Sequence, residues 1–399
     1  RLAQDWRRRR TSAGGGDVES AKILPVSKNY SCTISNGIVT LQLSPGDEAV
    51  VEINGSEENS LFIFVNPLET DRPDTSDPDV VYCKAGAIYR QPSLNLKSGQ
   101  TLYIEGGAIV KGSITANGAD NISIRGCGII DSRGVAARGI QLDGVNGLAI
   151  ENVTLINDIN WSTFIARSSD IAIDNYKVVA VENPDNATGC ENDALDLLGC
   201  TDAKVKGCFG YCHDDVFCVK SRKWTYAGEA RNILFEDCTA WNYLSGNSFV
   251  IGAETGKNIS GVVWRNCRSI HSGGRPSTLY RSGLGIHHCA GGHISDILFE
   301  NIFLEDCKEY GIYIDIRETG YQIGDGVTWS PGTMDGITLR NINLLQQARY
   351  RNVFYGYDAS EHCIRNVKIE NLVIDGKRVT GPDISSVFFA LKNTEFTIE

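Results

Sequence analysis

The sequence is short of several features that mark common classes of protein. No apolar run is long enough to span a bilayer, so we expect no membrane partner. The formal net charge is −11, and the one basic run is Arg7–Arg10, which argues against nucleic acid as a partner. No Cys-x-x-Cys pair is present to indicate a zinc site. One methionine against 42 glycines favours many turns over amphipathic helix.

Cysteine is the exception, because the chain has 13 and an odd number cannot all pair within one chain. We interpret these cysteines as reduced, buried hydrophobic residues. No signal peptide is visible at the start of the sequence. Together these observations favour a bacterial cytoplasmic location, or secretion if a signal was removed before residue 1. The sequence carries no indication of oligomeric state.

The 399 residues exceed what one compact core usually serves, which indicates several domains or a repeat architecture. From residue 121 onward one pattern recurs, in which two short alternating runs are separated by a break of one or two residues. These segments begin at residues 122, 148, 171, 203, 233, 262, 297, 337 and 367. The period of two excludes helix-pair solenoids, and the missing hairpin chemistry argues against β-propeller blades. We predict an all-β, right-handed parallel β-helix.

The register of the repeat makes two further predictions. The fifth residue of every segment is Gly, Asn or Asp, which favours a left-handed backbone there. These positions are Gly126, Asn152, Asn175, Gly207, Asp237, Asn266, Asn301, Asn341 and Asn371. The sixth residue is predicted to face the core. Four cysteines occupy that column, at residues 127, 208, 238 and 267.

The expected domain organisation has three parts. Residues 1–19 are interpreted as a mobile or expression-derived end. Residues 20–79 are predicted to form a small β-sandwich-like cap followed by a Pro/Asp-rich linker. Residues 80–399 are predicted to be the parallel β-helix catalytic domain. A cap is expected because an open β-helix end exposes strand edges.

Acidic residues in two neighbouring coils are the candidate catalytic groups. In "YCHDDVFCVK", Asp214 and Asp215 would face opposite sides of a regular strand, so we expect a bend or bulge there. "ENDALD" supplies Asp193, 21 residues before Asp214 and therefore about one coil away. Three clustered carboxylates raise at least one pKa, as acid-catalysed glycosidic cleavage requires. A solvated acidic turn and a calcium site remain alternatives.

Several motifs resemble the polygalacturonase-like glycoside hydrolases of family 28 and, more distantly, the dextranase and isopullulanase family 49. "LINDINWST", "ENDALD" and "HDDVFCVKS" carry the resemblance, which covers roughly residues 80–375. It implies an inverting hydrolase with Asp214 as the general acid and with Asp193 and Asp215 activating water. It also implies a carbohydrate substrate, pectic galacturonan first, with no metal and no organic cofactor.

The chain departs from the family 28 pattern at two places. The family's Gly-His-Gly reads "GNS", so Asn247 stands where the histidine would be. The family's Arg-Ile-Lys aligns with "GIHH", so Gly285 replaces the arginine and His287 falls at or near the lysine. The usual clamp on a uronate carboxylate is therefore missing.

Other side chains are candidates for the missing roles. His213 or His271 could replace the family histidine. Lys220, Arg281 or Arg317 could supply positive charge. Trp161 could stack on a sugar ring, although an aromatic residue in a β-helix is more often packing.

Three other functions are considered beside galacturonan hydrolysis. A dextranase-like hydrolase of a neutral α-glucan is favoured by the loss of the histidine and the arginine. A polysaccharide lyase on the same scaffold would need a Lys or Arg base and usually calcium. A non-catalytic glycan-binding β-helix is the third alternative.

Overall fold

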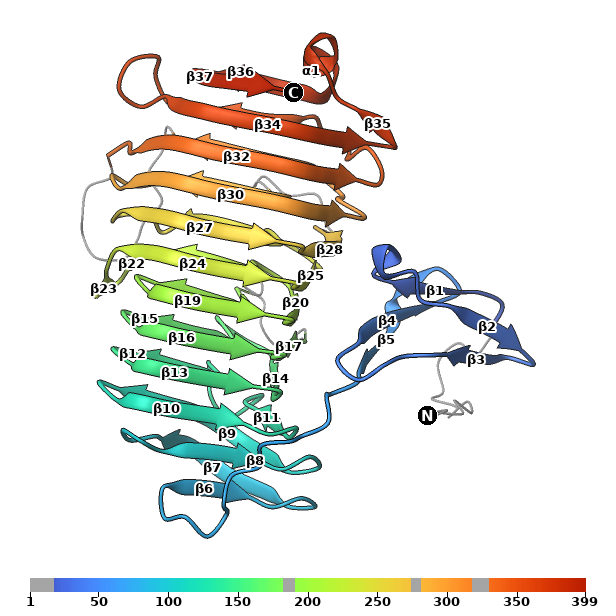
Figure 1. Ribbon diagram of the computed structural model, residues 1–399, viewed down its shortest axis with the longest axis vertical. Coiled ribbons are helices and arrows are strands. Elements are labelled where there is room, and N and C mark those ends of the chain that lie inside the picture. The colour runs from blue at the N-terminus through green and yellow to red at the C-terminus, as the bar shows by residue number, and fades with distance from the viewer. Residues whose placement is uncertain (1–17, 182–190, 274–280, 318–329) are drawn as a thin grey trace. The chain divides into compact units, whose positions relative to one another are not determined.

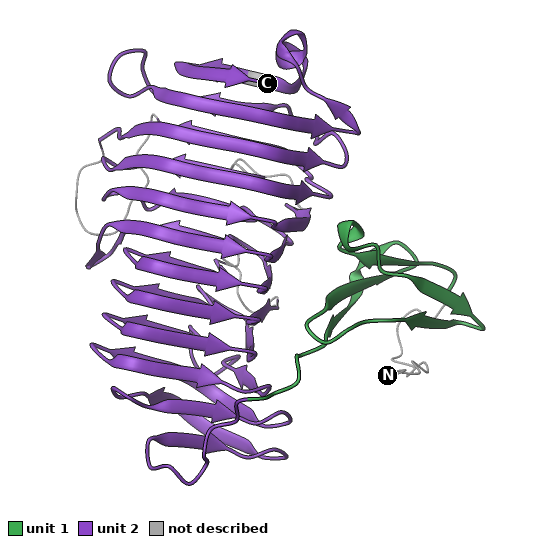
Figure 2. Ribbon diagram, in the orientation of Figure 1, with its two compact units in different colours: residues 1–70 green, residues 71–399 purple. Residues whose placement is uncertain are grey.

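The computed structural model describes residues 18–181, 191–273, 281–317 and 330–399, with the exception of the side chain at 389. Most of the expected N-terminal extension, residues 1–19, lies outside these ranges. The chain divides into two compact units, residues 1–70 and 71–399 (Figure 2). Within the described ranges, none of the helices has the length and apolarity to cross a membrane.

The first unit is a small antiparallel β structure. Its two Asn-Gly turns, Asn36–Gly37 and Asn54–Gly55, have positive φ at both residues, as two-residue hairpins favour. The first turn joins the two strands of a hairpin, and the second joins two strands of a three-stranded sheet. The hairpin is β2 (Cys32–Ser35) and β3 (Ile38–Leu41), the sheet is β1 (Ala21–Leu24), β4 (Glu48–Ile53) and β5 (Ser56–Phe64), and η1 (Val26–Lys28) follows β1.

The second unit is the predicted parallel β-helix, in which each strand pairs with its counterpart one coil later (Figure 1). The first strands of the coils form one column. They are β6 (Val80–Cys83), β8 (Thr101–Ile104), β10 (Asp120–Arg125), β13 (Asn146–Glu151), β16 (Ser169–Asp174), β19 (Thr201–Lys206), β24 (Ala230–Glu236), β27 (Ile259–Arg265), β30 (His293–Leu304), β32 (Thr333–Leu344), β34 (Ile364–Ile374) and β37 (Thr394–Ile398).

Two further columns complete the coils. The second is β7 (Ile88–Asn95), β9 (Ile109–Asn117), β11 (Ile129–Asp131), β14 (Thr154–Asn157), β17 (Lys177–Ala180), β20 (Phe209–Cys212), β25 (Thr239–Asn242) and β28 (Arg268–Ser272). The third is β12 (Ile140–Asp143), β15 (Thr163–Ala166), β18 (Leu195–Leu198), β21 (Phe217–Lys220), β26 (Phe249–Ala253), β29 (Ser282–His288), β31 (Tyr310–Ile316), β33 (Asn352–Tyr355) and β36 (Phe388–Lys392). The remaining elements are the hairpin β22 (Arg222–Lys223) and β23 (Tyr226–Ala227), then β35 (Lys377–Arg378), η2 (Gly381–Asp383) and α1 (Ile384–Val387).

The bend between the first and second strands confirms the predicted register. All nine positions predicted to be left-handed have positive φ. The asparagines among them also hydrogen-bond along the stack, because each amide can donate to the amide oxygen of the previous coil. The N···O distances are 2.7 Å for Asn175–Asn152, 3.0 Å for Asn301–Asn266, 2.8 Å for Asn341–Asn301 and 3.0 Å for Asn371–Asn341.

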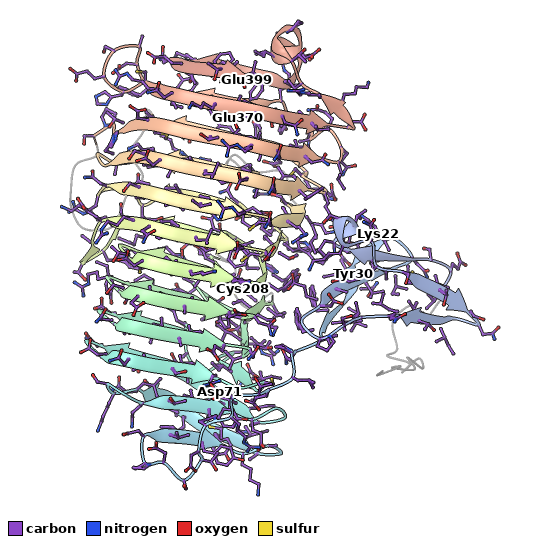
Figure 3. The ribbon with its side chains drawn as sticks, viewed as in Figure 1. Lys22, Tyr30, Asp71, Cys208, Glu370 and Glu399 are labelled. Carbon is purple, nitrogen blue, oxygen red and sulfur yellow. The ribbon has the colours of Figure 1, made fainter. Side chains whose placement is uncertain are left out.

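The cysteine column is confirmed at three of its four positions. Cys208 (Figure 3), Cys238 and Cys267 are completely buried, and every described cysteine is a free thiol. The prediction is wrong for Cys127, which is partly exposed. The pairing of β10 and β11 with the next coil leaves one extra residue in this bend. That residue shifts the register by one, so Gly128 takes the core position instead.

Candidate active site

The acidic residues lie just before the third strand of successive coils. Pairing aligns Leu195 of β18 with Phe217 of β21, and Phe217 with Phe249 of β26. Because the coils are in register, the positions two residues earlier are also neighbours. These are Asp193, Asp215 and Asn247, and the next coil continues the series with Ser282. Backbone hydrogen bonds support this order, since the N–H of Ala194 donates to the Asp215 carbonyl oxygen at 2.9 Å.

The Asp-Asp pair lies in the bend between β20 and β21, as the sequence predicted. Both side chains are partly exposed, whereas residues 213 and 216 on either side are buried. The bend packs directly on Gly246, which has a φ of +74°. A Cβ there would lie 2.3 Å from Asp214 Oδ1 and 2.5 Å from the Asp215 nitrogen. Only glycine therefore fits beneath the two carboxylates.

Asp193 is ion-paired with a buried lysine. The Nζ atom of Lys220 lies 2.9 Å from Asp193 Oδ2, 3.0 Å from Asp196 Oδ1 and 3.4 Å from Glu254 Oε2. Its ammonium also sits 3.8 Å from the centre of the Trp161 ring. Burial is the largest single influence and opposes the charged form of Lys220, but the combined attraction of Asp193, Asp196 and other neighbours outweighs it and raises the pKa of Lys220 well above the ordinary value. The lysine therefore carries a charge that several carboxylates share.

Asp215 is held by an amide rather than by a cation. Its Oδ1 atom accepts hydrogen bonds from the backbone N–H of Asn247 at 2.8 Å and from Asn247 Nδ2 at 2.9 Å. Burial and the nearby charge of Asp193 raise the pKa of Asp215 to about 7, although Lys220 and the Asn247 hydrogen bonds oppose them. This carboxyl group thus titrates near neutral pH.

Asp214 has weaker stabilisation of its charged form. Its Oδ2 atom accepts a hydrogen bond from Ser245 Oγ at 3.2 Å. Burial, followed by repulsion from Asp193 and Asp215, raises the pKa of Asp214 well above its ordinary value. A carboxyl group whose pKa is raised keeps its proton to higher pH and can donate it to a leaving oxygen.

Asp193 and Asp215 are close enough to share one small ligand. An oxygen of each carboxylate and the Cys218 sulfur all lie within 4.8 Å of one another. One water molecule could hydrogen-bond to both carboxylates at such a separation. A divalent cation would meet the positive charge of Lys220, which already occupies Asp193. The arrangement therefore suits water activation better than metal binding.

The comparisons with known proteins identify the family of this chain. The sequence profile described as "Glycosyl hydrolases family 28" matches residues 89–386. The chain belongs to this family. Membership of a glycosyl hydrolase family favours hydrolysis over the lyase and non-catalytic alternatives.

A curated relative and two solved structures are similar to this chain. The probable endopolygalacturonase E of Aspergillus niger is 24% identical over 243 residues, 56% of this chain and 58% of that protein. This chain thus spans little more than half the length of that relative. The family 28 exopolygalacturonase of Yersinia enterocolitica has a TM-score of 0.56 and 14% identity, over 84% of this chain and 78% of that chain. Dex49A from Penicillium minioluteum has a TM-score of 0.66 and 16% identity, over 98% and 80%.

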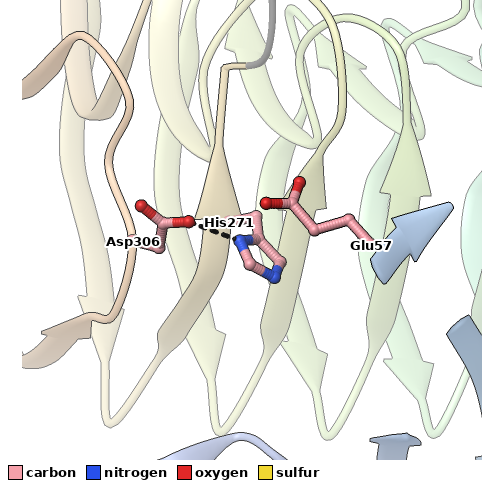
Figure 4. A group of neighbouring side chains, drawn as sticks. All are labelled: Glu57, His271 and Asp306. Carbon is pink, nitrogen blue, oxygen red and sulfur yellow. Dashed lines mark hydrogen bonds and ion pairs between the residues drawn. The ribbon is translucent and has the colours of Figure 1, made fainter. Parts of the chain in front are cut away.

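The two histidines considered as replacements for the family 28 histidine have different neighbours. His213 directly precedes Asp214 in the sequence, but its ring packs against Tyr211 and Tyr243, with centroids 6.2 Å and 5.4 Å away. His271 pairs with Asp306, with 2.8 Å between Nδ1 and Oδ2 (Figure 4). Neither ring has a described hydrogen bond to the three aspartates.

Three other candidates lie beside the site in different ways. Trp161 is only 5% exposed, so its ring packs on Lys220 and is not open to a sugar. Arg281 is buried, and among the described residues its Nε and Nη1 atoms have no hydrogen-bond partner. Arg317 Nε lies 3.4 Å from Asp315 Oδ2, and Asp315 in turn contacts His287 at 2.9 Å.

Sequence reasoning missed several residues that build the site. Glu254 and Asp315 lie in "GAETG" and "YIDI", where no motif marks them. Ser282 was missed because the coils before it differ in length. Gly246 could have been found, since it is the first glycine of the family's Gly-His-Gly.

Proposed function

We propose that this chain is an inverting hydrolase of galacturonan-type pectic polysaccharide. In this proposal Asp214 is the general acid, and Asp193 and Asp215 hold and activate the attacking water. The observation that carries it is the electrostatic difference among three neighbouring carboxyl groups. Asp193 has a lysine partner, Asp215 has two N–H donors, and Asp214 has one hydroxyl donor.

That difference matches the needs of acid–base cleavage. The acid must hold a proton, and the base must be ionised when water attacks. Burial and like charges favour the protonated form of Asp214. The ammonium of Lys220 favours the ionised form of its neighbours. These influences support Asp214 as the group that holds the proton.

Arg281 supports an anionic substrate. A guanidinium is always charged and normally fills its hydrogen-bonding capacity, yet two of its buried nitrogens have no described partner. Glu309 and, more weakly, Asp214 are near enough to act on it electrostatically. A uronate carboxylate would satisfy these donors in the role that the family's arginine has at position 285.

A neutral α-glucan is the second candidate substrate. It is favoured by Gly285, which leaves the usual clamp position without any side chain. A neutral sugar has no carboxylate that Arg281 could bind, so its binding would not depend on this arginine. The two substrates therefore predict different effects of changing that arginine, a loss of binding for the uronate and no change for the neutral glucan.

The test combines two variants with two substrates. Asp214→Asn should lower kcat by about 10²–10⁴-fold, the usual contribution of a general acid, with an unchanged circular dichroism spectrum. Arg281→Gln should raise KM on polygalacturonate and leave cleavage of dextran unaffected. Proton NMR of the first products should show inversion. Full activity of Asp214→Asn on every glycan would reject the catalytic assignment.

A further inference from the structure

The orientation of the Asn247 amide is determined by its neighbours. Its Oδ1 atom lies 3.0 Å from the backbone nitrogen of Ser282. That nitrogen can only donate, so the atom facing it must be the amide oxygen. The Nδ2 group then points the other way, toward Asp215. Whatever fixes the oxygen of Asn247 therefore also fixes the donor on Asp215.

A histidine reaches the same amide oxygen from the next coil. His287 Nε2 lies 3.3 Å from Asn247 Oδ1, and His287 Nδ1 lies 2.9 Å from Asp315 Oδ1. Both ring nitrogens thus face acceptor oxygens. A neutral imidazole has one N–H group and can serve only one of them, whereas an imidazolium can serve both. The second bond forms when the ring gains a proton.

Missing side chains make this contact possible. Gly285 lies on the same strand as His287 and beside Asn247. A Cβ at residue 285 would stand 3.0 Å from Asn247 Oδ1, closer than most carbon–oxygen contacts. The absence of the family's arginine therefore has a structural consequence, because it leaves room for the asparagine and the histidine to meet.

We propose that His287 and Asp315 are positioning residues for Asp215 and act through the Asn247 amide. Asp315 orients the His287 ring, the ring holds the amide oxygen, and the amide N–H holds the Asp215 carboxylate. The inference rests on the proposed role of Asp215 as part of the base. It gives a function to the asparagine that stands where the family has a histidine.

The charges around His287 set the pH range of the effect. Burial lowers the pKa of His287 below its ordinary 6.5, Arg317 adds to this, and Asp315 opposes it. From β31 the ring meets Asp315 and the Tyr313 ring, whose centroid is 5.6 Å away, and Arg317 directly follows that strand. From the bend just before β26 it meets Asn247. The ring is thus neutral at neutral pH and gains its second donor in acid, where Asp215 most needs help to stay ionised.

Two isosteric variants separate the two contacts of His287. His287→Gln places an amide near the Nε2 position, facing Asn247. His287→Asn places one near the Nδ1 position, facing Asp315. At pH 5 we expect His287→Asn to lower kcat about tenfold with little change in KM, because a hydrogen bond to a charged group weakens. His287→Gln should stay within about threefold of the wild type.

The pH profile distinguishes positioning from simple packing. The acid limb of kcat/KM should move to higher pH in His287→Asn, and the loss should shrink above pH 7. The matched control is His288→Asn, one residue along, which keeps the Nδ1 contact with Thr255 at 2.8 Å. This control should lower the Tm without moving the acid limb. Equal pH profiles for all variants would overturn the proposal.

A measurement without substrate keeps this inference separate from the proposed function. The carboxyl ¹³C signal of Asp215, assigned with Asp215→Asn, can be titrated in the wild type and in His287→Asn. The pKa of Asp215 should rise in the variant, because its amide donor is less firmly held. An unchanged titration would overturn the inference, even if the enzyme is active. If no glycan is cleaved but the titration shifts, the function fails and the inference stands.

The wild type alone provides a test that needs no variant to fold. At neutral pH, ¹⁵N-histidine NMR should show His287 protonated at Nδ1, the atom facing Asp315. A neutral ring protonated at Nε2 would contradict the orienting role of Asp315.

Discussion

Two bends of the same coils differ in how side chains at equivalent positions of neighbouring coils interact. In the bend after the first strand, asparagine follows asparagine, and each amide donates to the one before it. At the start of the third strand, two aspartates, Asp193 and Asp215, are followed by Asn247 and Ser282. An amide is both donor and acceptor and can repeat indefinitely, whereas an ionised carboxylate only accepts. Carboxylates on neighbouring coils therefore need cations or amides between them, which makes this bend irregular and chemically useful.

Removing the cation should break the acidic bend most severely. Lys220→Met leaves Asp193, Asp196 and Glu254 without their shared ammonium. We expect a loss of about 3–5 kcal/mol in the free energy of unfolding, as for other buried ion pairs that lose one partner. Urea denaturation at pH 7 measures it.

The matched control is a lysine with one exposed ion pair on the same β-helix. Lys204 lies 3.5 Å from Glu236, and its side chain is 55% exposed. Lys204→Met should change stability by less than about 0.5 kcal/mol. Similar losses in the two variants would mean that the carboxylates near Lys220 carry little charge.

The acidic bend should also make stability depend on pH. The pKa of Asp215 is raised from 3.8 to about 7 in the folded chain, so folding favours its protonated form. Its stabilising contribution is complete below about pH 4 and is lost as the pH rises to about 7. Since one pKa unit corresponds to about 1.4 kcal/mol, the loss is about 2–4 kcal/mol.

Asp215→Asn removes this titration and serves as the comparison. Its Tm should equal that of the wild type near pH 4 and exceed it near pH 7.5. Differential scanning calorimetry across this range measures the difference. A constant gap between the two proteins would show that Asp215 has an ordinary pKa in the folded chain.

The sequence predicted the bend after the first strand almost completely. The alternation of apolar residues fixed which residues face the core, and the left-handed positions followed from Gly, Asn and Asp at one register. The failure at Cys127 came from a single extra residue in one bend. Such an insertion is invisible to periodicity, because the sequence on either side keeps its pattern.

The acidic bend was only partly predictable. Asp193, Asp214 and Asp215 could be placed together because one coil separates them. The contacts of Asn247 with Ser282 and His287 could not, because the coils after residue 215 differ in length. The shared contacts of Lys220 with several carboxylates could not be predicted either, because buried charges are arranged by three-dimensional packing and leave no periodic signal.

The asparagine bend should respond weakly and without loss of catalysis. Asn341 has a φ of +54° and hydrogen-bonds to Asn301 and Asn371 at 2.8 Å and 3.0 Å. Asn341→Ala loses both bonds and strains the left-handed backbone, which should cost about 1–2 kcal/mol. Asn341→Gly keeps the backbone and should cost less. Both should keep the wild-type kcat, because the remaining asparagines of the column still hold the bend in place. A fall in kcat would mean that the two bends of a coil are coupled.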